Sequence, residues 1–136
     1  MARHLRHRIA QRYPTVTTPI QWEVAKLGRR GPKPKLQWAE AAIIELSAFG
    51  AAVVAPAEWA VPVGVRVKVR WGGLEGTVLV RREAHYSRSS GLKLYGVEFA
   101  DNPSELGKAL YEQLILPQLA LQGAEAGSPA VWTGQP

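Results

Sequence analysis

The stretch VRVKVRWGGLEGTVLVRREAHY, residues 65–86, predicts the class of fold more directly than any other part of the chain. Its first half alternates apolar and basic residues, which is the period of a strand with one face in a core. The inward positions are then Val65, Val67, Val69 and Trp71, and the outward ones are Arg66, Lys68 and Arg70. The pair Gly72–Gly73 marks a hairpin turn. Residues 75–86 therefore form a returning antiparallel strand.

Further β-rich segments lie on both sides of this hairpin. Strands are expected in residues 15–27, 36–47, 50–56 and 92–101, and an exposed loop in the basic, Gly/Pro-rich residues 28–35. Residues 36–47 also contain Ala and Glu, which leaves a helix open there. As a strand, this segment would turn Ile44 and Leu46 inward, together with Leu36, Trp38 and Ala42. Six or so short antiparallel strands in series favour a barrel or a sandwich.

The end of the chain changes from strand to helix. Asn102 can cap a helix, Pro103 suits its first turn, and Glu105 can complete a capping box. An apolar stripe follows at every fourth residue, namely Leu106, Leu110 and Leu114. Pro117 is expected to stop or kink this helix. The chain then divides into a basic arm at 1–17, a folded domain at 18–116 and a loosely structured tail at 117–136.

Positive charge is concentrated in the first quarter of the chain. The net charge is +6, yet residues 1–35 contain nine Lys or Arg and one acid, whereas the remainder contains eight bases and ten acids. The expected partner of this segment is an anion. A transit peptide is also Arg-rich, but Ser is absent from the first 46 residues. No secretory or membrane-spanning run is apparent, so a cytoplasmic protein is expected.

Residues for catalysis or metal binding are scarce. The chain has no cysteine, which excludes a disulfide, a thiolate metal site and a thiol nucleophile. It has no nucleophile elbow and no phosphate-binding Gly-Lys-Ser/Thr loop. His4 and His7 have metal-ligand spacing but no carboxylate nearby in the sequence. We therefore expect neither an enzyme nor a resident metal or cofactor.

Two short segments suit a nucleotide ligand. Arg8 and Arg12 form Arg-x-x-x-Arg before the first strand, and Arg6 can add a phosphate contact. Guanidinium groups pair with phosphate and with the O6 and N7 atoms of guanine. In ELSAFG, residues 45–50, the carboxylate of Glu45 can accept from guanine, and the hydroxyl of Ser47 can donate. Gly50 allows a turn and a close ligand. Each segment alone also fits a plainer interpretation, namely a solvated arm and a strand-ending turn.

Taken in order, these segments resemble the PilZ family of bacterial cyclic di-GMP receptors. The resemblance rests on Arg-x-x-x-Arg, then Glu-x-Ser-x-x-Gly, then VPVGVRVKVRW, EGTVLVRRE and LYGVEFAD, and covers residues 8–116. It implies a six-stranded antiparallel β-barrel with a C-terminal α-helix. It also implies that Arg8 and Arg12 hold the ligand, that Ser47 and Gly50 form the pocket rim, and that position 45 contacts a base. The family has Asp or Asn where this chain has Glu45, and the loop at 28–35 is long for it.

Three functions remain open from the sequence. The resemblance implies a receptor whose arginine arm rearranges on binding cyclic di-GMP and signals to a downstream protein. The alternative is an adaptor of the same fold that binds no nucleotide and uses an exposed tryptophan among Trp22, Trp38, Trp59 and Trp71 as an anchor. A nucleic-acid binder is the least favoured, because no aromatic residue interleaves the bases of residues 66–70. No membrane partner is expected.

Overall fold

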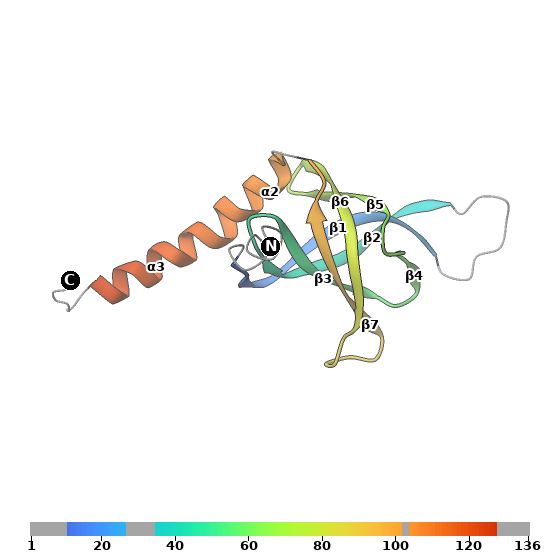
Figure 1. Cartoon of the computed structure of the whole chain (residues 1–136), viewed down its shortest axis with the longest axis horizontal. Coiled ribbons are helices and arrows are strands. Elements are labelled where there is room, and N and C mark those ends of the chain that lie inside the picture. The colour runs from blue at the N-terminus through green and yellow to red at the C-terminus, as the bar shows by residue number, and fades with distance from the viewer. Residues whose placement is uncertain (1–10, 27–34, 102–103, 128–136) are drawn as a thin grey trace, which may run out of the picture.

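A computed structural model describes residues 11–26, 35–101 and 104–127. It contains seven strands followed by one helical segment that has three parts (Figure 1). The strands are β1 (Tyr13–Lys26), β2 (Leu36–Leu46), β3 (Gly50–Pro56), β4 (Trp59–Ala60), β5 (Arg66–Trp71), β6 (Leu74–His85) and β7 (Leu92–Phe99). The helical parts are α2 (Glu105–Leu110), the π-helical η1 (Tyr111–Ile115) and α3 (Leu116–Gly127). None of these helices is both long enough and apolar enough to span a bilayer.

Six of the strands close into an antiparallel barrel. The sheet runs in the order β2-β3-β7-β6-β5-β1, and the additional pairing of β1 with β2 closes it. The short β4 pairs with the end of β1 as an extra strand. The expected class, an all-β six-stranded antiparallel barrel with a C-terminal α-helix, is confirmed. Among the described residues β4 is the strand left outside this closed sheet, and β1 pairs with β5 at two positions, Gln21 with Arg70 and Trp22 with Val69.

The hairpin predicted around Gly72–Gly73 is formed by β5 and β6. Gly72 and Gly73 have φ angles of 56° and 84°, as the two central residues of a type I′ turn require. Val67 and Val69 are buried, as predicted, and Trp71 is half-buried against the core. Val65 was predicted to point inward but is 37% exposed, because β5 begins only at the next residue.

The predicted faces of β2 are wrong over most of its length. The buried residues are Ala39, Ala41, Ile43 and Leu46 rather than the series that contains Trp38 and Ile44. The reason is a β-bulge. Ile43 pairs with Val53 and Glu45 pairs with Ala52, so Ile44 is an extra residue on β2. The insertion moves Ile44 and Glu45 to the outer side together and returns Leu46 to the core.

The barrel core is centred on two aromatic residues. Trp22 of β1 is fully buried and packs edge-to-face against Tyr95 of β7, with ring centroids 5.3 Å apart. Among the described residues the indole Nε1 of Trp22 has no hydrogen-bond partner. Burial raises the pKa of Tyr95 above its ordinary value of 10.0. Both rings come from strands that are far apart in sequence, so they tie opposite walls of the barrel together.

The helical segment begins on the barrel wall. The hydroxyl of Ser104 accepts from Gly107 N at 3.0 Å, so Ser104 is the N-cap. The predicted capping box, with Asn102 as cap and Glu105 at its third position, is therefore wrong. Gly107 lies against Phe99, where a Cβ would come within 2.8 Å of the ring, so the helix sits close to the end of β7. Leu106, Leu110 and Ile115 are buried against the barrel.

Pro117 does not end the helix. Residues 111–115 are π-helical, and the N–H of Leu116 donates to Tyr111 O, five residues back. This wider turn comes directly before the proline ring, which has no N–H and cannot join the usual ladder. The helix then continues as α3 to Gly127 and extends away from the barrel (Figure 1). The predicted loose tail is thus helical over residues 117–127, and residues 128–136 lie outside the described residues.

Candidate functional site

Four of the residues singled out in the sequence, Arg12, Glu45, Ser47 and Gly50, lie at one corner of the barrel. β1 and β2 are antiparallel, and Pro14 pairs with Glu45. The segment before β1 therefore arrives beside the end of β2. Arg12 Nη1 lies 3.6 Å from Glu45 Oε1, and the two side chains are 61% and 35% exposed. Of the predicted site residues, the structure brings Arg12 and Glu45 together, while Arg6 and Arg8 lie outside the described residues.

The boundary of the predicted arm also shifts. The arm was expected to occupy residues 1–17, but β1 begins at Tyr13. Tyr13 packs edge-to-face on Tyr111 of η1, with ring centroids 6.2 Å apart. Burial raises the pKa of Tyr111, and the neighbouring Tyr13 adds to this effect. Arg12 is therefore attached directly to a strand residue that is fixed against the C-terminal helix.

The turn between β2 and β3 is held by Ser47. Its backbone N–H donates to Gly50 O at 2.9 Å. Its hydroxyl accepts from Phe49 N at 3.3 Å and from Gly50 N at 3.2 Å, and Ser47 is only 9% exposed. These are the local bonds that a strand-ending Ser turn predicts. The Ser47 hydroxyl therefore binds backbone N–H groups of the turn. The side chains available to a ligand at this corner are those of neighbouring residues.

Gly50 has a structural role in this turn. A Cβ atom at this position would lie 2.1 Å from Val97 O of β7. Gly50 pairs with Glu98, and Phe49 O accepts from Phe99 N at 2.8 Å. The absence of a side chain at position 50 thus allows the turn to pack closely against β7 and to pair with it.

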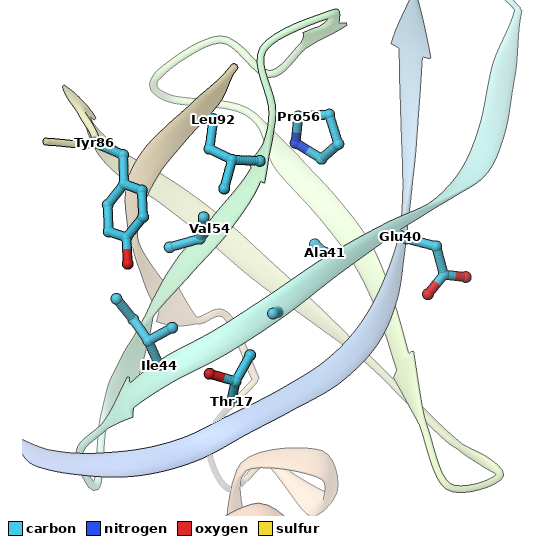
Figure 2. A pocket seen from close by; sticks show the side chains of 9 residues that line it. Thr17, Glu40, Ala41, Ile44, Val54, Pro56, Tyr86 and Leu92 are labelled. Carbon is cyan, nitrogen blue, oxygen red and sulfur yellow. The ribbon is translucent and has the colours of Figure 1, made fainter. Parts of the chain in front are cut away.

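An apolar hollow lies on the outer wall beside this corner (Figure 2). Its volume is about 330 Å³, and its lining residues are Thr17, Glu40, Ala41, Ala42, Ile44, Val54, Pro56, Tyr86 and Leu92. Ile44, which the bulge turns outward, precedes Glu45 directly. In Figure 2 the phenol of Tyr86 points across the hollow toward Ile44. The hollow is thus continuous in sequence with the charged corner, and most of its lining residues are apolar.

Sequence reasoning missed this hollow. Val54 comes from β3, Tyr86 from the β6–β7 connection and Leu92 from the start of β7. They meet Ile44 only because β2 pairs with β3 and β3 pairs with β7. The available signal was a short apolar run on β3 that exceeds strict alternation, since Val53, Val54 and Ala55 are all buried. Such a run indicates a strand that is covered on both faces.

The excess positive charge belongs to two segments that precede and follow β1 in the sequence. Residues 1–10 contain Arg3, Arg6 and Arg8, and residues 27–34 contain Arg29, Arg30 and Lys33, with no acid in either segment. These six bases equal the net charge of +6. β1, which lies between the two segments in the sequence, has 14 residues. Only the first segment is attached at the Arg12–Glu45 corner.

The basic face of β5 carries an aromatic stack that was not foreseen. The guanidinium carbon of Arg70 lies 3.7 Å from the ring centroid of Trp38 on β2. This contact spans β1, which separates the two strands in the sheet. Arg70 already covers a face of Trp38 on which a nucleic-acid base could otherwise stack. The described residues also contain no cluster of three His, Cys, Asp or Glu that could hold a metal ion.

Comparison with known proteins adds no relative. The chain matches no protein-family model, and it matches no curated protein.

Proposed function

We propose that the protein is a bacterial, cytoplasmic receptor for cyclic di-GMP, which it binds across the Arg12–Glu45 corner and the adjacent apolar hollow. One observation carries the proposal. The residue that ends the arginine motif lies 3.6 Å from the first residue of Glu-x-Ser-x-x-Gly, although the two are 33 positions apart in the sequence. Two motifs of the PilZ-like order, which are far apart in the sequence, thus each contribute a residue to the same corner of the barrel wall.

The chemistry of the corner matches the chemistry of the ligand. Cyclic di-GMP has two phosphates and two guanines. The guanidinium of Arg12 can pair with a phosphate oxygen or with the O6 and N7 atoms of a guanine. The carboxylate of Glu45 can accept from the adjacent N–H donors on the Watson–Crick edge. A purine face can pack on Ile44 and Val54 in the hollow, which has the size of small-ligand sites.

The Arg12–Glu45 pair is weak enough to be exchanged for a ligand. An exposed ion pair contributes at most about 1 kcal/mol, because solvent and salt screen it. Several charge-assisted hydrogen bonds to a dianion, at about 1.5–3 kcal/mol each, exceed that contribution. On binding, Arg12 leaves Glu45 for the ligand, and the arm carrying Arg8 and Arg6 closes over it. Tyr13 then transmits the rearrangement to Tyr111 on the helix, where a downstream protein can detect it.

Calorimetric titration with cyclic di-GMP tests the proposal. We expect saturable heat with a dissociation constant near micromolar, which corresponds to a binding free energy of about −8 kcal/mol. Arg12→Ala and Arg8→Ala should each abolish the heat, while Arg3→Ala, which removes the same charge outside the motif, should retain it. GMP at equal concentration should give weaker heat, because it offers one base. The proposal is wrong if wild-type protein gives no heat at high ligand concentration.

A second candidate is an adaptor of the same fold that binds no nucleotide. Two observations favour it. The bonds of Ser47 and the close approach at Gly50 serve the turn itself, so neither residue requires a ligand. Glu45 also stands where the family has Asp or Asn. An adaptor would show no heat with cyclic di-GMP and would retain its partner after Arg12→Ala, whereas a receptor would lose ligand-dependent partner binding.

A further inference from the structure

A groove lies where the helical segment leaves the barrel. One wall consists of Leu114, Pro117, Gln118 and Leu121, and the other is Val16 of β1; the volume is about 360 Å³. The four helical residues follow the spacing i, i+3, i+4 and i+7, which is one face of a helix. The groove is therefore a contact surface built from one helical face around Pro117 and the start of β1.

The apolar side chains of this surface are unusually exposed. Val16 is 79% exposed and Leu121 is 63% exposed, and Leu116 on the adjoining helical face is 46% exposed. Single exposed apolar residues are common, but several around one groove indicate a binding surface. Figure 1 shows that α3 extends beyond the barrel, so this face is accessible to another molecule along its length.

The composition of the groove identifies the kind of occupant. Residues 13–22 and 113–124 contain no charged residue, although 28 of the 136 residues in the chain are Lys, Arg, Asp or Glu. A nucleic acid, an acidic peptide or an anionic headgroup would find no charge partner on these walls. The groove suits an uncharged, Leu-rich helix, and residues 113–124 of this chain are such a helix.

We infer that the groove is the contact between two copies of the chain, with their α3 helices antiparallel. The surface contains both a hollow and a protruding leucine, and a two-fold contact requires that a surface be complementary to itself. Leu121 of each copy enters the groove of the other, near the two-fold axis. Each copy has a charge of +6, and this contact allows the copies to meet without placing like charges together. The inference does not depend on nucleotide binding.

The contact is small, so the dimer is weak. α3 has 12 residues and is about 18 Å long. A pair of such helices buries less than the roughly 800 Å² per partner of a standard interface. The copies are then in equilibrium at the concentrations used for structural work. Weak association is reversible, so the groove is exposed whenever the copies separate.

Sedimentation velocity on the full chain tests the inference. Between about 10 µM and about 1 mM, where so small a contact saturates, the mean mass should rise from 14.9 kDa toward twice that value. Leu121→Glu should keep the protein monomeric at every concentration. The matched control is Val63→Glu, because Val63 is also exposed, at 55%, but lies in the loop before β5. This variant should dimerise like the wild type. Salt should not weaken the dimer, because the contact contains no charges.

Cysteine cross-linking tests the geometry separately. The chain has no cysteine, so Leu121→Cys introduces a single thiol. Two such thiols near a two-fold axis can come within disulfide distance. Mild oxidation should cross-link Leu121→Cys much faster than Val63→Cys. The inference is wrong if the wild type stays at 14.9 kDa at the highest concentration, if Leu121→Glu dimerises normally, or if both cysteine variants cross-link equally.

Discussion

Substitution of Gly50 by alanine tests how the corner is built. The added Cβ would lie 2.1 Å from Val97 O, and it would lie 3.1 Å from Glu98 Cα. Real Cβ atoms essentially never approach a heavy atom within 3.0 Å, so the β7 backbone must move by about 0.9 Å. The atom in the way belongs to the backbone and cannot swing aside as a side chain could.

The expected cost follows from the bonds around the clash. Overpacking of this kind typically costs about 1–3 kcal/mol. Displacement of β7 also weakens the bond from Phe99 N to Phe49 O, at about 1 kcal/mol. We therefore expect Gly50→Ala to lower the free energy of unfolding by about 2–4 kcal/mol. A variant with this loss should still fold, because many domains have about 5–15 kcal/mol of stability.

Urea denaturation followed by tryptophan fluorescence measures this loss, because Trp22 is buried in the barrel core. The matched control is Gly91→Ala, where an added Cβ meets nothing within 4 Å. That variant should stay within about 1 kcal/mol of the wild type. If Gly50→Ala were as stable as Gly91→Ala, the close approach to β7 would be wrong, and Gly50 would be better explained by a ligand.

Three further predictions concern the corner and the core. Ser47→Ala should lower the unfolding free energy by about 1–3 kcal/mol in thermal melts, because the N–H groups of Phe49 and Gly50 lose their acceptor; unchanged stability would mean that water replaces the hydroxyl. Glu45→Asp should keep or tighten cyclic di-GMP binding in calorimetry, whereas a large loss would show that the longer side chain fits its own geometry. The unfolding free energy should fall as pH rises above 10. Burial raises the pKa of Tyr95 in the folded state, so the folded protein favours the neutral phenol. The stability that this provides is lost as the pH rises through the folded-state pKa. Tyr95→Phe should flatten that dependence in urea titrations at pH 8–11, and an unchanged slope would place its origin elsewhere.

The sequence predicts the barrel well because its signals are local. Alternation around Val67 and Val69 and the turn at Gly72–Gly73 each depend on neighbours within a few residues, and the structure confirms them. The number of strands in series leaves a barrel or a sandwich open, and the resemblance implies the closed barrel that the structure has. The meeting of Arg12 with Glu45 is also consistent with sequence order, because antiparallel pairing joins the start of one strand to the end of the next.

The bulge in β2 and the N-cap of the helix could not be predicted from local patterns. The bulge at Ile44 inserts one residue into β2 and reverses its faces, yet nothing in the alternation of IIELS shows where the ladder slips. Ser104 caps the helix in place of Asn102, and both are good N-cap residues, so tertiary packing of Gly107 on Phe99 decides between them.

Non-local contacts account for the rest. The helix passes Pro117 because π-helical hydrogen bonding before it accommodates the ring. Arg70 covers Trp38 across an intervening strand, and the apolar hollow combines residues of β1, β2, β3 and β7 with Tyr86. Each depends on which strands become neighbours in the closed sheet, which sequence periodicity does not specify.

Titration of isotopically labelled protein with cyclic di-GMP, followed by amide chemical shifts, tests the receptor proposal most directly, since it reports both whether the ligand binds and where. We expect saturable shifts at Arg12, at residues 44–50 and at Tyr86 and Leu92, with smaller ones at Tyr111. A spectrum that does not change at saturating ligand, or one whose shifts fall only on residues 66–70, would contradict a cyclic di-GMP site at this corner.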